Sequence, residues 1–174
     1  RPSLLGLLLV GIAAHMGCTG GESDAPTGPF DLLDLEAWRL VEPDEDPWEP
    51  LRGERTRCEA TDIEVEGPTL EISTAFCGHG TVAIPTTATL RAGDHATVLL
   101  YHATLTAPEP TEGVMVLRVG VADVAAEALE LPLAAATYPH DVVFDDVPVG
   151  EALFHVHNHG ANSWRVAQVE VERP

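Results

Sequence analysis

The sequence Glu-Ala-Leu-Phe-His-Val-His-Asn-His-Gly-Ala-Asn-Ser-Trp-Arg occupies positions 151–165. Phe154 and Val156 are apolar, and the alternate positions hold His155, His157 and His159. Because successive side chains of a β-strand point to opposite faces, this pattern predicts a strand with one apolar face and one histidine face. Gly-Ala-Asn then supplies turn chemistry, and the next strand opens at Trp164. The stretch therefore predicts two strands joined by a tight turn.

The rest of the body, residues 58–174, consists of short apolar runs separated by turn signals. Strands are expected at 62–66, 70–72, 81–84, 96–106, 114–119, 122–131, 142–144 and 164–171, with Gly78-His79-Gly80 as a break. Residues 96–106 are apolar on both faces, which predicts the longest and most central strand. Residues 122–131 contain helix formers, but their place between strands and before Pro132 favours a strand. Roughly nine strands without a helical crossover predict an all-β fold, a two-sheet antiparallel β-sandwich of jelly-roll-like type.

The first residues are typical of an export signal. Leu4–Ala14 is apolar, too short to span a bilayer, and suited to the core of a signal peptide. Gly17-Cys18 follows, and here the chain resembles bacterial lipoproteins, although His15 stands where that class usually has a Leu-type residue. The resemblance implies a signal peptide over 1–17, truncated at its start, and a lipid on Cys18 that anchors the protein to a membrane of the bacterial envelope. Plain secretion, with Cys18 free or with cleavage after Ala14, is the alternative.

Residues 18–57 are expected to form the lipidated cysteine and an acidic, proline-rich tether ahead of a sandwich domain at 58–174. Such a composition buries little apolar surface. One piece, residues 30–38, has the apolar content to be ordered. It is interpreted as an arm that packs on the domain, with a lid or ligand-stacking arm as the alternative.

The chain has three cysteines. If Cys18 carries lipid, Cys58 and Cys77 remain as an even pair in an oxidising compartment, where a disulfide is expected. None of the cysteines has the spacing of a zinc site built on thiolates.

Charge narrows the set of partners. The formal net charge is −19, and all nine basic residues are arginines. Phosphate backbones would repel such a chain, so nucleic acid is excluded as a partner, and electrostatic docking on anionic lipid is disfavoured. The acidic surface is interpreted as solvated, with loose capture of cations as the alternative.

Residues 141–172 carry a further resemblance. His-Asn-His-Gly-Ala-Asn-Ser-Trp followed by Val-Ala-Gln-Val-Glu-Val resembles the last two strands of jelly-roll binding modules, among them carbohydrate-binding and galactose-binding-like domains. The resemblance implies a ligand-binding sandwich and makes a carbohydrate or a protein the candidate ligand, with His159, Asn162 and Trp164 as candidate ligand-binding residues. Trp164 would be a stacking platform if exposed, but its neighbour Val166 favours a place in the core.

The histidines suggest a second kind of site. Two histidines at i and i+2 on a strand point the same way and can share one divalent transition metal ion. His155 and His157 have that spacing, and His102 is the first candidate for a third ligand, with His140 next. A solvent-facing histidine strand without metal, or a polar ligand groove, is the alternative.

A metal-bearing His-x-His also resembles the cupins, but no Glu occurs between Glu151 and Glu170 to complete their ligand set. No serine lies in a nucleophile-elbow context, so no catalytic residue is assigned. The chain is interpreted as a cell-envelope lipoprotein with a binding or surface-interaction module, more a binding protein than an enzyme. A metal-dependent cupin-like enzyme and a structural envelope protein without a small ligand are the rivals.

The final segment predicts an irregularity. Strict alternation would place Trp164 and Val166 on one face and Val169 and Val171 on the other. Burying all four side chains contributes roughly 1.5 to 3 kcal/mol each, against about 1 kcal/mol for one disrupted ladder position. We therefore expect a β-bulge or kink between Val166 and Val169 and a largely buried Trp164.

Overall fold

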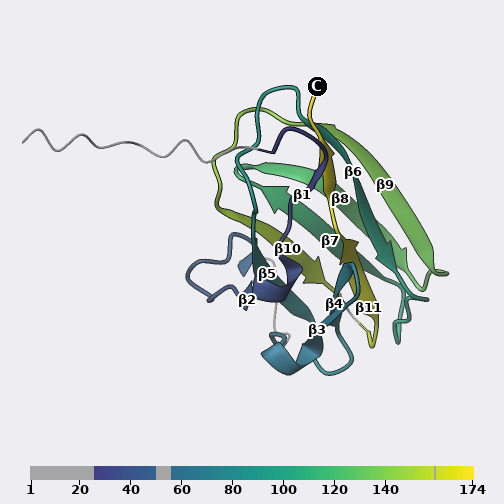
Figure 1. Ribbon diagram of the computed structural model, residues 1–174. Helices are drawn as coiled ribbons and strands as arrows, with labels where there is room; N and C mark the ends of the chain where they lie inside the picture. The colour runs from purple at the N-terminus through teal and green to yellow at the C-terminus, as the bar shows by residue number, and fades with distance from the viewer. Residues whose placement is uncertain (1–25, 50–55, 159) are drawn as a thin grey trace, which may run out of the picture.

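The computed structural model describes residues 26–49, 56–158 and 160–174, which form two packed β-sheets (Figure 1). The elements before residue 80 are β1 (Phe30–Asp31), η1 (Leu35–Ala37), β2 (Arg39–Leu40), η3 (Ala60–Asp62), β3 (Ile63–Glu66), β4 (Thr69–Ser73) and β5 (His79–Pro85). The later ones are β6 (His95–His102), β7 (Thr111–Val119), β8 (Ala122–Leu131), β9 (Ala136–Val143), β10 (Glu151–His157), β11 (Ser163–Ala167) and β12 (Glu170–Glu172). The predicted all-β class is confirmed. None of the described residues forms a helix long and apolar enough to cross a membrane.

The two sheets are antiparallel and exchange the chain repeatedly. One sheet has the order β1-β12-β6-β11-β4-β3, with β9 paired to the other edge of β6. The second sheet has the order β2-β5-β10-β7-β8. From β4 onward the chain passes between the sheets at nearly every connection, which is the jelly-roll-like crossing predicted from the sequence. The sandwich, jelly-roll-like and antiparallel, is therefore the fold of the described residues.

The core lies between the two inner faces. Each strand contributes alternate side chains, as the period of two requires. Fully or almost fully buried members are Leu70, Ile72, Val82, Ile84, Val98, Leu100, Met115, Leu117, Phe154, Val156, Trp164 and Val166. Gly113 on β7 makes room for the indole ring, because a Cβ there would lie 2.8 Å from Cη2 of Trp164. The core thus depends on a small residue on one sheet facing the largest residue on the other.

Part of the region assigned to the tether belongs to the sandwich. β1 pairs with β12, and β2 pairs with β5, so residues before position 58 extend both sheets. Leu32 and Leu33 are buried, and so is Trp48 at 8% exposure. Residues 26–49 therefore pack on the domain, as was expected for residues 30–38, and give it apolar surface.

Cys58 and Cys77 form a disulfide with a Cα–Cα distance of 4.9 Å. Cys58 is buried and leads into η3, whereas Cys77 lies just before β5. The predicted bridge is confirmed, and it fits an exported protein.

The expected irregularity in the final segment is present. Val166 pairs with Leu100 of β6, and Val171 pairs with Ala96 of the same strand, so the final segment holds one residue more than its partner. The break falls between β11 and β12, where the Gln168 backbone N–H donates to the Pro68 carbonyl. All four apolar side chains, Trp164, Val166, Val169 and Val171, are completely buried.

Several strand boundaries differ from the expectation. β6 ends at His102 rather than at residue 106, is shorter than β7 and β8, and leaves Leu99 and Tyr101 only partly buried. β9 is longer than the predicted 142–144. β5 begins at His79, within the expected break. The flanking glycines do not prevent an extended backbone, and pairing with β10 extends the strand to His79. Residues 122–131 form strand β8, as predicted.

Candidate functional site

The histidine strand is β10, at the centre of the five-stranded sheet between β5 and β7. Phe154 and Val156 are buried in the core, as predicted. His155 and His157 lie on the opposite, outer face of the same sheet. His155 is nevertheless only 2% exposed, because the N-terminal arm covers it.

Trp48 forms that cover. Its ring stacks on the His155 ring, with centroids 4.8 Å apart and an interplanar angle of 18°. The guanidinium of Arg118 lies 4.4 Å from the centroid of the Trp48 ring, as in a cation–π contact. Asp46, also buried, accepts a hydrogen bond from the backbone N–H of Trp48. The arm is thus held on the outer face by aromatic and polar contacts together.

A chain of hydrogen bonds places a proton on Nδ1 of His155. The Thr81 hydroxyl lies 2.7 Å from Oδ2 of Asp46 and 2.7 Å from Nδ1 of His155. The hydroxyl has one proton, which it donates to the carboxylate, so its oxygen accepts from the Nδ1–H of the imidazole. Nδ1 of His155 therefore carries a proton. Burial, together with nearby His157 and His79, lowers the pKa of His155 to about 3.

His79 was not expected on this face from the sequence pattern. It is buried at 1% exposure and lies directly opposite His157 in the ladder between β5 and β10. Its flanking glycines were interpreted as a break, so its place in a strand was not expected. The three imidazoles on this face are therefore His79, His155 and His157, not the set proposed from the sequence.

The structure does not bring His102 to this face. His102 lies on β6 of the other sheet, opposite Trp164 in the ladder. Its Nδ1 is 2.7 Å from the Ala103 carbonyl, and its Nε2 is 3.2 Å from the Tyr138 hydroxyl. His140 also lies in that sheet, on β9, 3.1 Å from Glu127. The predicted trio of His102, His155 and His157 is not assembled, because β6 and β10 belong to different layers.

Among the described residues, one group of three metal-type side chains converges, and it is not on the histidine face. Cys58, Asp62 and Cys77 bring their ligand atoms within 4.8 Å of one another. Both thiols are joined in the disulfide, so these sulfurs are not thiolate ligands.

The candidate ligand-binding residues serve the fold. Trp164 is completely buried, so it is a core anchor rather than a sugar platform. Asn162 is buried: its amide nitrogen donates to the Thr106 carbonyl and to Oδ1 of Asn158, and its oxygen accepts from the Thr106 N–H. These contacts fix the turn after β10. His159 lies outside the described residues.

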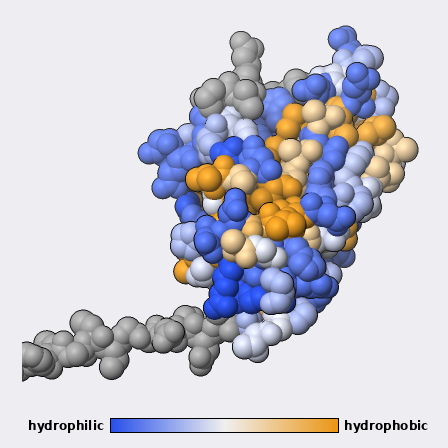
Figure 2. Space-filling model, turned by 90° about the horizontal axis from the view of Figure 1, so that it is seen from above, coloured by the Kyte–Doolittle hydropathy of each residue, from blue (hydrophilic) through white to orange (hydrophobic). Residues whose placement is uncertain are grey.

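An apolar surface lies at one end of the sandwich, where β7 turns into β8, where β9 ends at Val143 and where residues 144–150 lead into β10. Val121, at the tip of the β7–β8 hairpin, is 99% exposed, Val143 is 75% exposed and Val149 is 59% exposed. We call these three residues, with Val147 and Pro148, the valine surface. Figure 2 looks down on the molecule and shows apolar residues gathered among hydrophilic ones.

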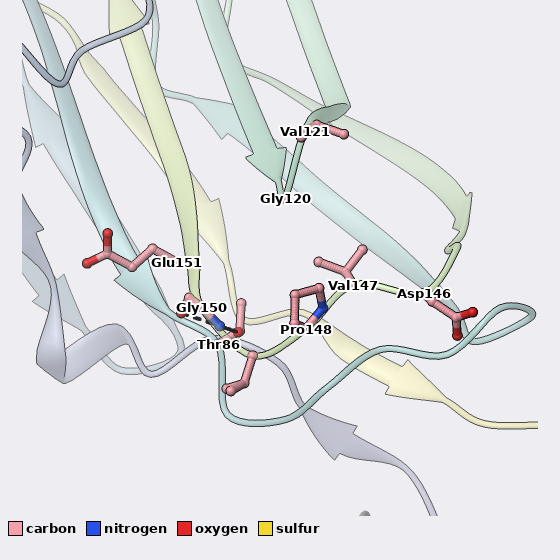
Figure 3. A pocket seen from close by; sticks show the side chains of 9 residues that line it. Thr86, Gly120, Val121, Asp146, Val147, Pro148, Gly150 and Glu151 are labelled. Carbon is pink, nitrogen blue, oxygen red and sulfur yellow. Dashed lines mark hydrogen bonds between the residues drawn. The ribbon is translucent and has the colours of Figure 1, made fainter.

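Two hollows adjoin at the valine surface. One, of about 320 Å³, lies between the hairpin tip and the loop that holds Val147 and Pro148 (Figure 3). The other, of about 430 Å³, extends along the ends of β8 and β9. Both are lined by Val121, Asp146 and Val147, so they form one groove.

A third hollow lies at another part of the surface. It has a volume of about 390 Å³ and is lined by Thr56, Thr74, Ala75, Phe76, Cys77, Gly78, Gly160 and Ala161. Phe76 is 89% exposed beside it. An exposed aromatic ring next to polar groups is the arrangement on which a sugar ring can stack.

No family model matches the sequence, and no curated protein matches it. Among solved structures, the K3 cleaved adhesin domain of Lys-gingipain from Porphyromonas gingivalis W83 shares 10% identity at a TM-score of 0.45, over 83% of this chain and 98% of that one. A structure titled "CBM4 structure and function" shares 12% identity at a TM-score of 0.41, over 78% and 85% of the two chains. TmCBM61 in complex with β-1,4-galactotriose shares 11% identity at a TM-score of 0.37, over 84% and 88%. At these sequence identities and TM-scores the neighbours do not indicate a ligand or a binding site for this chain.

Proposed function

We propose that this protein is an exported binding module, held to a membrane of the bacterial envelope by a lipid on Cys18, that docks a partner at the valine surface. The observation that supports docking is the exposure of Val121, Val143 and Val149 around one groove. Large apolar side chains gathered on the surface of an acidic domain are the usual mark of an interaction site, because covering them removes apolar area from water.

The anchor rests on separate support. The run Leu4–Ala14 followed by Gly17-Cys18 has the order of a lipoprotein signal, and the Cys58–Cys77 disulfide fits an oxidising compartment. The chain with an added initiating methionine should incorporate labelled palmitate in a bacterium that processes lipoproteins, and the Cys18→Ala variant should not. Equal labelling of the two proteins, or none in either, would remove the anchor from the proposal.

Docking is tested by cross-linking in the producing cells. A photo-reactive amino acid in place of Val121 or Val149 should give a discrete adduct on irradiation. The matched control is Glu64 on β3, an exposed position in the other sheet. Adducts at Val121 and Val149 but not at Glu64 support the proposal. A missing adduct, or equal adducts at all three positions, contradicts it.

Carbohydrate binding is a second candidate, and the exposed ring of Phe76 beside its hollow favours it. The apolar face of a sugar ring can stack on an aromatic side chain, so Phe76 would act as the platform that Trp164 cannot be. Calorimetry with β-linked gluco- and galacto-oligosaccharides should show binding that Phe76→Ala abolishes. Binding that survives this substitution would place the sugar elsewhere, and no binding of either series would end this candidate.

A further inference from the structure

The groove at the valine surface combines apolar walls with carboxylates. Asp123, Asp141, Asp145 and Asp146 line the larger hollow, and Asp146 and Glu151 line the smaller one. No Lys, Arg or His is among the residues that line either hollow. The chemistry offered to a ligand is therefore aliphatic contact with negative charge beside it.

Two of these carboxylates are each paired with an arginine. Asp123 accepts from Nε of Arg118 at 2.6 Å, and Glu151 accepts from Nε and Nη2 of Arg39 at 2.9 Å each. The contact with Arg39 also holds the pKa of Glu151 below its ordinary value. The oxygens of Asp123 and Glu151 are therefore engaged by arginine within the protein and attract a charged ligand less strongly than the other carboxylates.

The remaining three carboxylates are exposed and have no ion-pair partner within the described part of the chain. Asp141 accepts from the Thr97 hydroxyl, and Asp146 accepts from the backbone N–H of Ala92, each through a single oxygen. Both contacts are with neutral donors, so they leave the charge uncompensated. Asp141, Asp145 and Asp146 therefore place uncompensated negative charge beside the exposed valines.

The size of the hollows restricts what they hold. At about 320 and 430 Å³ they lie at the small end of the range of roughly 300–1,000 Å³ for pockets that enclose a whole ligand. Each is suited to one or two side chains of a longer molecule that lies along the groove. A bare metal ion does not fit the arrangement, because no three ligand atoms converge here within the described residues.

We propose that the valine surface binds a cationic polypeptide segment, in which an aliphatic side chain enters the groove between Val121 and Val147 and a flanking Lys or Arg meets Asp145 and Asp146. This rests on the proposed function, since it names the partner of the same surface. Charge complementarity argues for it: a chain of net charge −19 repels acidic partners and a second copy of itself, whereas a basic segment is attracted.

The test uses a fluorescent, amidated peptide of alternating Leu and Arg, with matched peptides in which Arg is replaced by Glu or by Gln. Fluorescence anisotropy should detect binding of the Arg peptide alone, and the affinity should fall as salt is raised. Val121→Ser should weaken binding about tenfold, in the range of a central interface residue. Because Val121 is 99% exposed, this change leaves the fold intact.

The charge is tested by the double variant Asp145→Asn and Asp146→Asn, in which an amide oxygen still accepts from Ala92. We expect a loss of about fivefold or more and a weaker dependence on salt. Glu64→Gln, which removes an exposed carboxylate from β3, should change nothing. Equal binding by all variants would mean non-specific attraction to an acidic protein and would overturn the inference. Equal binding of the Gln peptide would overturn its charge component.

The two proposals fail separately. If Val121 cross-links in cells while the Arg peptide does not bind, docking stands and the cationic partner is wrong. If sedimentation shows a dimer that Val121→Ser dissociates, the occupant is a second copy and the inference is overturned. If neither cross-link nor peptide binding is found, both proposals fall.

Discussion

The indole ring of Trp48 lies flat on the imidazole of His155, with ring centroids 4.8 Å apart, although 107 positions separate the two residues in the chain. The contact joins the N-terminal arm to the central strand of the five-stranded sheet. From the sequence pattern, the histidine face of β10 would be exposed to water. The contact with Trp48 covers it and forms a small second core there. Several properties of the protein are expected to depend on it.

Trp48→Ala should destabilise the fold by about 3 kcal/mol, the lower end for removing a buried large aromatic side chain. The loss arises because His155 and the stem of Arg118 are uncovered together. Trp48→Phe keeps a ring over the imidazole and should lose less. Urea unfolding of the three proteins measures this, and an Ala variant as stable as the wild type would show that the arm does not contribute to folding.

Acid should reveal the buried state of His155. Its pKa in the folded protein is about 3, against an ordinary value of about 6.5 in the unfolded chain. The unfolded state therefore binds a proton that the folded state does not, and stability falls as the pH drops from about 6.5 toward 3. Between pH 7 and pH 4.5 this residue should remove about 2–3 kcal/mol.

His155→Asn keeps an N–H donor near Thr81 but does not titrate, so the acid-dependent loss should be smaller in that variant. His95→Asn is the matched control, because His95 has a side chain that is 51% exposed and lies beside Glu172. Urea midpoints at pH 7 and 4.5 give the comparison. The buried-imidazole explanation is rejected if wild type and His155→Asn lose the same stability.

Arg173 should be needed for the fold. Its guanidinium donates to both oxygens of Asp94, and the side chains of this pair are 8% and 1% exposed. The contact lowers the pKa of Asp94. Arg173→Met leaves a buried carboxylate without its partner and should cost about 3–5 kcal/mol. Arg173→Met combined with Asp94→Asn should recover part of that loss in thermal unfolding, and no recovery would argue against the charge as the cause.

Gly113→Ala should be destabilising by about 1–3 kcal/mol, because the new methyl group would press on Trp164 and on Leu131. Gly28→Ala is the control, since nothing lies within 4 Å of a Cβ at that position. It should change stability by less than about 0.5 kcal/mol. Denaturant midpoints that shift equally in the two variants would contradict the packing argument.

Removing the disulfide through Cys58→Ala and Cys77→Ala should lower stability by about 3 kcal/mol, the value for a closed loop of this size in the chain-entropy model. A reducing agent should shift the unfolding midpoint of the wild type by a similar amount and leave the double variant unchanged. A wild type that does not respond to complete reduction would mean that the bridge contributes little.

The sequence alone determined the fold class, the pairing of Cys58 with Cys77, and the inward and outward faces of β10. The alternation of apolar and polar side chains is a local signal, which the hydrophobic effect converts into one buried and one exposed face of a strand. The cysteine count is a property of the composition, and it left one pair to be joined. The break between Val166 and Val169 was predictable for the same reason, since burying four apolar side chains outweighs one ladder position.

Only the tertiary structure decided which residues meet. His102 was predicted beside His155, but the layer to which a strand belongs depends on long-range pairing that spacing does not encode. His79 joined the histidine face because β5 pairs with β10, and Trp48 covered it because the arm folds back. The valine surface likewise forms from a hairpin tip and a loop, whose exposed side chains are brought together by the packing of the sheets beneath them.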